Sequence, residues 1–279
     1  MADLPHPSTG QLFPSPVPPG TGWPGDPASA GTPVARTAGG VARLAARATL
    51  DELDARVSVC AACERLVEWR EKVAHDKRAS FADEPYWGRP VPGWGDPEPG
   101  ILIVGLAPAA NGANRTGRIF TGDRSGDWLF ASLHRVGLAT RSTSTAAGDG
   151  QALVGARMVC AVRCAPPDNK PTPEERVTCA PWLVRELALV ADSVRAVVCL
   201  GAFGWDAALR GLGSVGYDVP RPRPKFAHAR ELTLSSGARP VTLIASYHPS
   251  QHNTFTGRLT EDMMDAVFRR GIEVARAAM

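Results

Sequence analysis

Short runs of consecutive apolar residues, separated by helix-like segments, constrain the fold of this chain more than any other feature. The run Ile101–Leu106 is rich in branched side chains, which is typical of a strand buried on both faces of a sheet. Further strands are predicted at Arg157–Arg163, Arg195–Leu200, Glu231–Leu234 and Val241–Ser246. Helices are predicted at Ser125–Val136, Pro173–Ala191 and Thr260–Ala277, and from a capping box at Thr49 toward Cys60. This alternation predicts an α/β fold with a mostly parallel sheet covered by helices on both faces.

Ligands of such folds bind outside the carboxyl ends of the strands, so the loops after residues 106, 163 and 246 are the first candidates for a functional site. The first loop contains small residues, among them Gly105 and Ala107, that let the backbone approach a flat ligand. Phe120 offers a stacking face, and Asp123 places a carboxylate just before a helix. The loop has neither the lysine of a Walker motif nor the G-x-G-x-x-G pattern.

The second and third loops add polar side chains at the same edge of the sheet. Asn169 lies in a proline-rich turn, where asparagine is also favoured for conformational reasons alone. His248 follows directly after a predicted buried strand, with Asn253 and Arg258 a few residues further on. A histidine in this place indicates a functional site rather than a solvated loop.

Two pairs of cysteines indicate a metal centre. Cys60 and Cys63 form a C-x2-C pair, and Cys164 and Cys179 bracket the turn that carries Asn169. Their four thiolates would suit either zinc or an iron–sulfur cluster, and the spacing does not distinguish the two. The remaining two cysteines lie within predicted apolar strands and are interpreted as core residues; they are Cys160 and Cys199.

The chain is close to neutral, with 31 basic and 28 acidic side chains and a formal net charge of +3. A general cationic coat for nucleic acid is therefore excluded, and any DNA contact must come from a local patch. The sequence has no apolar run of roughly 18 residues to span a membrane and no export signal at its start, so a cytoplasmic protein is expected.

Residues 1–40 have the composition of a disordered tail, because they hold nine of the 25 prolines and few apolar residues. A single catalytic domain is accordingly expected over residues 45–279. The segment Ser142–Gln151 is interpreted as a flexible surface loop.

Several motifs in this chain, taken together, resemble the family 5 (type b) uracil-DNA glycosylases. The resemblance runs from about Leu50 to the C-terminus and rests on Glu84-Pro-Tyr-Trp87, Pro90-Val-Pro-Gly-Trp-Gly-Asp96, Gly105-Leu-Ala-Pro108, Asn114-Arg-Thr-Gly117, Phe120-Thr-Gly-Asp123, Arg163-Cys-Ala-Pro-Pro167, Asn169-Lys-Pro-Thr-Pro-Glu-Glu175 and Ser246-Tyr-His248 with Asn253 and Thr256-Gly-Arg-Leu259. The chain departs from the pattern at Ala109, Asn111 and Pro249.

The resemblance implies a three-layer α/β/α sandwich and monofunctional cleavage of the glycosidic bond of uracil in DNA. It also implies a 4Fe-4S cluster on Cys60, Cys63, Cys164 and Cys179, and so favours iron over zinc. The expected partner is DNA containing uracil or other deaminated bases, bound by a monomer associated with the nucleoid.

The reaction that the resemblance implies gives each loop residue a hypothetical role. Uracil must be flipped out of the duplex, and Phe120 would stack on the extruded ring. His248 would hydrogen-bond the base O2, Asp123 would face the sugar and a water molecule, and Asn169 and Asn253 would position the water and the base. Phosphate contacts are expected from basic residues near these loops, namely Arg115, Arg118, Lys170 and Arg258.

Specificity is predicted from Cys160, which lies four residues before Cys164 on a strand leading to the site. An asparagine there could pair with uracil, whereas cysteine cannot, so a broad pocket that accepts hypoxanthine is predicted. The alternative is that Cys160 only fills the core and that the backbone of residues 105–109 reads the base.

Two other classes of protein remain compatible with parts of this pattern. A nucleic-acid-binding module clasped by four cysteines would explain the metal site but would leave Asp123 and His248 without a role. A hydrolase of small nucleotides would use those residues, but the sequence contains no phosphate-cradling motif for it.

Overall fold

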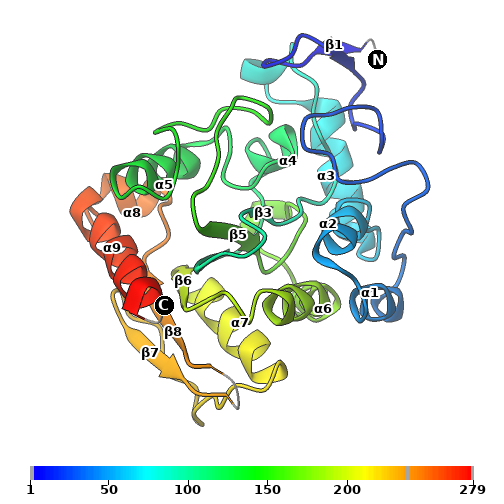
Figure 1. Ribbon diagram of the computed structural model, residues 1–279. Coiled ribbons are helices and arrows are strands. Elements are labelled where there is room, and N and C mark those ends of the chain that lie inside the picture. Colours follow the sequence, from blue (N-terminus) through cyan, green and yellow to red (C-terminus); the bar gives the residue numbers. More distant parts are fainter. Residues whose placement is uncertain (1–2, 237–238, 278–279) are drawn as a thin grey trace.

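A six-stranded sheet with four parallel central strands forms the centre of the molecule, in a computed structural model that describes residues 3–236 and 239–277 (Figure 1). The strand order is β3-β5-β4-β6-β8-β7. The strands are β3 (Trp94–Gly95), β4 (Ile101–Gly105), β5 (Ala156–Cys160), β6 (Ala196–Leu200), β7 (Glu231–Leu234) and β8 (Val241–Ser246). The neighbours β5, β4, β6 and β8 run parallel, while β3 and β7 are antiparallel edge strands. The predicted mostly parallel sheet is confirmed.

Helices cover both faces of this sheet. On one face α5 (Arg124–Arg135) packs on α9 (Glu261–Ala277), and α9 lies against β6 and β8. On the other face α6 (Pro173–Leu189) packs on α7 (Gly201–Ser214), which lies against β4 and β6. All residues of the four parallel strands are buried, as their apolar sequences predict. The three-layer α/β/α sandwich is therefore confirmed.

The remaining helices lie before the sheet or within its connections. They are α1 (Ala38–Ala45), α2 (Leu50–Ser58), α3 (Glu64–Asp76), α4 (Ala113–Thr116), α8 (Gln251–Phe255) and the 3-10 turns η1 (Ala79–Phe81) and η2 (Pro167–Asn169). The predicted capping box at Thr49 is present at the start of α2, and a second one at Thr172 starts α6. Among the described residues, no helix is both long enough and apolar enough to cross a bilayer.

The N-terminal segment is folded, and the prediction that residues 1–40 are disordered is wrong for residues 3–40. It begins with a small hairpin of β1 (Leu4–Pro5) and β2 (Leu12–Phe13). Phe13 and Trp23 are buried, and the Trp23 indole N–H donates to the carbonyl of Thr116 at 3.2 Å. Few apolar anchors suffice here because the prolines reduce the entropy that this segment loses on folding.

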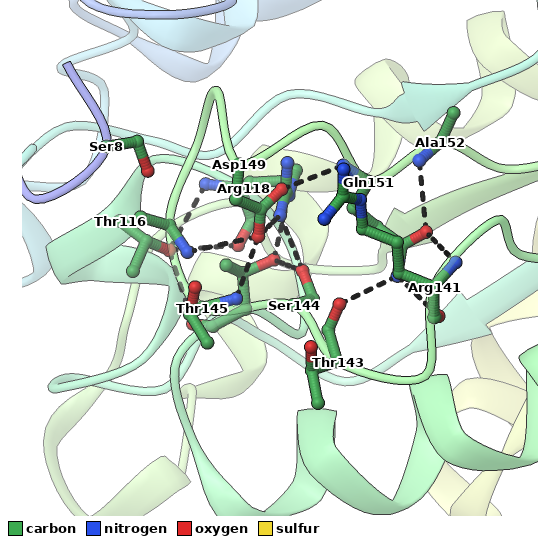
Figure 2. A network of polar contacts seen from close by, with 12 residues as sticks. Ser8, Thr116, Arg118, Arg141, Thr143, Ser144, Thr145, Asp149, Gln151 and Ala152 are labelled. Atoms are coloured by element: carbon green, nitrogen blue, oxygen red, sulfur yellow. Dashed lines mark hydrogen bonds and ion pairs between the residues drawn. The ribbon is translucent and has the colours of Figure 1, made fainter.

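The segment Ser142–Gln151 is likewise held in place, although it was expected to be a flexible surface loop. The carboxylate of Asp149 accepts from the Arg118 guanidinium and from the backbone N–H groups of Thr145 and Gln151 (Figure 2). Ser144 is fully buried and contacts both Arg118 and Thr121. The reason is electrostatic: the buried Arg118 needs a counter-charge, and Asp149 supplies it from this loop.

Candidate active site

The three predicted loops meet in one cavity of about 290 Å³ at the carboxyl ends of β4, β5 and β8. Most of the residues predicted to bind or act on a substrate line it. The lining residues are Leu106, Ala107, Pro108, Ala109, Ile119, Phe120, Asp123, Ser125, Cys160, Asn169, His248 and Ser250. The cavity has room for a single nucleobase with its sugar near the mouth, a small site by the usual measure of ligand pockets.

The floor of the cavity depends on the close approach of Gly105 and Phe120. Gly105 is paired in register with Cys160 on the neighbouring strand. A Cβ atom at residue 105 would lie 2.9 Å from Cζ of Phe120, so only glycine allows this ring to pack against the strand end. Phe120 has a positive φ of 51° and lies 6.0 Å from the His248 ring, measured between centroids. These two rings present an aromatic wall to any flat ligand.

Asp123 is fixed at the entrance of the cavity by the start of α5. It is the N-cap of this helix, and its Oδ1 accepts from the N–H of Gly126 at 2.9 Å. Its other oxygen faces Gly112, where a Cβ atom would come within 2.0 Å of Oδ2. Burial raises the pKa of Asp123, although the backbone N–H groups of the helix start oppose this shift. The result is a desolvated carboxylate held in a single place.

His248 is a neutral imidazole at physiological pH. Burial lowers the pKa of this side chain to about 4, because the charged form loses its hydration inside the protein. Its backbone carbonyl accepts from Nδ2 of Asn253 at 2.8 Å. Asn253 is not among the residues that line the cavity, and through this bond it holds the backbone of His248 in place. Its hypothesised contact with base or water stays a prediction.

Asn169 reaches the cavity from the turn η2. Both Asp168 and Asn169 adopt left-handed backbone angles, with φ values of 52° and 56°. This conformation is tolerated by asparagine and aspartate better than by most residues. Asn169 lines the cavity and also the groove outside it, so it stands where a water molecule or a sugar would pass.

Two serines that line the cavity were not singled out from the sequence. Ser125 lies in the first turn of α5, and Ser250 is the N-cap of α8. The signal for Ser250 was present in the sequence, since a serine just before a helix is a common N-cap.

A larger open groove of about 950 Å³ leads to the cavity and shares Ala109, Asp123 and Asn169 with it. Two exposed cations, Arg78 and Arg124, line this groove, and neither forms an ion pair with a described residue. They are candidates for phosphate contacts that sequence reasoning missed.

The phosphate contacts expected of Arg115 and Arg118 are not supported by the structure. Both side chains are buried: Arg115 pairs with Glu84, and Arg118 pairs with Asp149 at 2.7 Å. Their charges serve to hold loops together, because a buried guanidinium is stable only when it is paired.

Lys170 and Arg258 are exposed, as a contact to DNA would require. Neither forms an ion pair with any residue that the structure describes. The Arg258 guanidinium lies 4.6 Å from the ring centroid of Tyr247, the residue next to His248. These two remain predicted phosphate contacts.

The four cysteines of the predicted metal centre line a second, smaller cavity behind the turn η2. Cys60 and Cys63 lie between α2 and α3, Cys164 follows β5, and Cys179 belongs to α6. Within the described ranges, no three histidine, cysteine or acidic side chains converge on a single point where one ion would sit. The four thiols surround the cavity instead, and they act on one another electrostatically.

Positive charge accompanies these cysteines. The Arg70 guanidinium donates to Sγ of Cys164 at 3.1 Å, and the backbone N–H of Arg163 donates to Sγ of Cys179 at 3.4 Å. Two buried donor nitrogens of Arg163, Nε and Nη1, find no acceptor among the described residues. Burial and the neighbouring cysteines raise the pKa of Cys63 to about 12, so these thiols would ionise only together with a cationic partner.

Comparison with known proteins gives the class to which this fold and site belong. The family model of the uracil DNA glycosylase superfamily matches residues 92–270, more than half of the chain, and the chain therefore belongs to this superfamily. The type-5 uracil-DNA glycosylase of Mycobacterium tuberculosis is 56% identical over 271 residues, which cover 97% of this chain and 98% of the relative. That of Thermus thermophilus is 49% identical over 207 residues, or 74% of this chain and 90% of the relative.

A relative from another group of uracil-DNA glycosylases is less similar to this chain. The type-4 uracil-DNA glycosylase of Pyrobaculum aerophilum is 28% identical over 161 residues, which cover 57% of this chain and 71% of the relative. Within the superfamily the chain is thus a member of the type-5 group, in agreement with the resemblance found in its motifs.

Proposed function

We propose that this protein is a DNA repair glycosylase that hydrolyses the N-glycosidic bond of uracil flipped out of DNA. The observation that carries the proposal is the cavity in which Phe120, Asp123 and His248 converge from two loops. The names of its type-5 relatives support the same activity. A cavity of this size takes one extruded base and excludes a duplex, so flipping must precede the chemistry.

The reaction needs two kinds of electrostatic stabilisation. As the bond between C1′ and the base breaks, the base leaves with the electron pair and the sugar becomes positively charged, until a water oxygen attaches to C1′ and loses a proton. Asp123, acting in its carboxylate form from the start of α5, stabilises the charged sugar and orients the water. His248, neutral because the pKa of its imidazole is lowered to about 4, donates a ring N–H to O2 of the departing base.

The range of bases is a further part of this proposal. Cys160 lines the cavity next to Gly105, and its thiol cannot form the paired hydrogen bonds with which an amide would recognise uracil. Burial raises the pKa of Cys160 to about 12, so the side chain is a neutral thiol. We therefore expect hypoxanthine and other deaminated bases to be accepted beside uracil.

A 4Fe-4S cluster held by Cys60, Cys63, Cys164 and Cys179 completes the proposal. One feature favours a cluster over a zinc ion: Arg163 lines the cavity between the cysteines, and two of its buried donor nitrogens have no acceptor among the described residues, whereas the sulfides of a cluster could accept from them. Bound there, the cluster would be a structural clasp that ties residues 60–63 to the turn carrying Asn169. The protein as isolated should contain iron and sulfide and absorb near about 400 nm. Zinc in place of iron would overturn this assignment.

One experiment separates the glycosylase from a binding module. The protein is incubated with a duplex that contains one uracil, then with alkali, and strand cleavage at the uracil position is measured. We expect cleavage with the uracil duplex and none with a thymine control. A uracil duplex that is bound but stays intact would favour the binding module. We expect a monomer, and light scattering on the same preparation measures the oligomeric state. Association with the nucleoid follows from such a substrate.

A further inference from the structure

The loop that precedes β7 carries the densest positive charge in the chain and has no role in the site described above. Residues 220–230 contain four cations and no acidic residue, whereas the whole chain has a net charge of only +3. The cations are Arg221, Arg223, Lys225 and Arg230, and all four are exposed. This charge is therefore concentrated on a single loop.

Two of these cations, Arg221 and Lys225, have side chains without a partner among the described residues, and the Arg230 guanidinium donates only to the backbone carbonyl of Lys225. Arg223 lies 3.2 Å from Asp206, which also pairs with Arg210 on α7. Arg221, Lys225 and Arg230 form no ion pair with any residue in the described ranges. The acidic residues of the adjoining groove are Asp206 and Asp218, so the cations outnumber the nearby acids.

The loop is rigid enough to present these charges in a fixed arrangement. The indole N–H of Trp205, which is buried, donates to the carbonyl of Pro224 at 2.8 Å. Further along, the N–H of Ala229 donates to the carbonyl of Ala245, and the N–H of Ala245 donates to the carbonyl of Arg230. Three prolines alternate with the cations at residues 220–224 and limit the backbone further. Less entropy is then lost when a ligand binds.

The loop is joined to the active site through Tyr247. The N–H of Tyr247 donates to Nδ1 of His228 at 3.1 Å, and the two rings stack with centroids 4.9 Å apart. Phe226 packs against the same tyrosine at 5.9 Å, and Arg258 contacts its ring. Because Tyr247 immediately precedes His248, these contacts connect the loop 220–230 to the strand end that carries a residue of the base cavity.

From this geometry we propose that the loop 220–230 is a second DNA-binding element, which holds phosphates of the duplex flanking the flipped base. This inference rests on the proposed glycosylase function and adds a contact to the DNA on one side of the flipped base. DNA carries the dense negative charge that such a cluster attracts, and each neutralised phosphate makes binding more dependent on salt. The loop contributes affinity and register, while the base itself is recognised in the cavity.

The test removes two of the unpaired charges and measures binding to a product-like duplex. In the variant Arg221→Gln/Lys225→Gln, the affinity for a duplex with a tetrahydrofuran abasic site should fall on the order of tenfold at low salt. The slope of log affinity against log salt should decrease by about 1 to 2, as expected for two lost phosphate contacts. Truncating the duplex on the side that the loop covers should abolish the difference from the wild type.

Two controls make the result specific. The variant Arg36→Gln/Arg47→Gln makes the same change of charge at two exposed positions, one just before α1 and one just after it. This helix lies far from β7 in Figure 1. This control pair should bind DNA as the wild type does. The variant Arg221→Lys/Lys225→Arg, which keeps both positive charges, should also bind as the wild type does. Unchanged affinity and salt slope in the folded Gln variant, or an equal loss in the control pair, would overturn the proposal. Uracil excision by the wild type is measured separately, so failure of the proposed function itself would be recognised.

Discussion

Replacing Asp123 by asparagine isolates the charge of this residue from its structural role. Asparagine caps helices as well as aspartate, so the hydrogen bond to Gly126 should survive in Asp123→Asn. Burial raises the pKa of Asp123, which means that the ionised carboxylate lowers the free energy of unfolding at neutral pH. Removing the charge should therefore leave the melting temperature unchanged or raise it. Asp123→Ala, in contrast, should lose about 1 kcal/mol with the cap.

The catalytic consequence has the opposite sign. If the carboxylate stabilises the positive sugar in a desolvated cavity, its loss should slow single-turnover excision by about 10²- to 10³-fold, or roughly 2.7 to 4 kcal/mol. Excision by the wild type should also decline as the pH falls through the raised pKa of Asp123, because the carboxylate then becomes protonated. Asp123→Asn should lack this acidic decline. A stable asparagine variant with a rate near that of the wild type would refute the electrostatic role.

Three other predictions concern the cavity and the N-terminal segment. His248→Ala should reduce the rate of single-turnover excision by at least about tenfold. The wild-type pH–rate profile should show no histidine inflection near pH 6.5, because the pKa of His248 is lowered to about 4. An inflection at that pH would contradict the neutral imidazole. Cys160→Asn should raise the ratio of uracil to hypoxanthine excision rates, and an unchanged ratio in a folded, active variant would mean that this position does not read the base. Trp23→Ala should lower the free energy of unfolding, measured by urea denaturation, by about 3 to 5 kcal/mol. The control Leu12→Ala should have little effect, because this side chain in the same segment is 59% exposed. Equally small effects of both substitutions would show that the segment is not part of the core.

Much of the fold and the site could be predicted because the signals are local. A run of branched residues such as Ile101–Leu106 specifies a buried strand whatever its neighbours, and the position of a strand end specifies where loops meet. For this reason the cavity contains Phe120, Asp123, Asn169 and His248, which were chosen from the sequence alone.

What could not be predicted depends on partners that are distant in the sequence. Trp23 bonds to Thr116, which is 93 residues away, and a tryptophan among prolines does not reveal that partner. In the same way Arg118 resembles a phosphate contact until Asp149, 31 residues further on, is seen to pair with it. Composition measures how much a segment can bury on its own, and it does not measure what the rest of the chain offers to it.

Because Gly112 and Asp123 are in close contact, the residues at these two positions should vary together in evolution. Any side chain at residue 112 would displace the carboxylate, since even a Cβ atom would come within 2.0 Å of it. A substitution at residue 112 is therefore not neutral while Asp123 retains its function. Once Asp123 itself is replaced, residue 112 is no longer restricted to glycine by this contact. Among descendants of a common ancestor, glycine at the first position and aspartate at the second should be retained or lost together. A sequence with aspartate but a larger residue in place of the glycine should mark a lineage in which base excision has decayed.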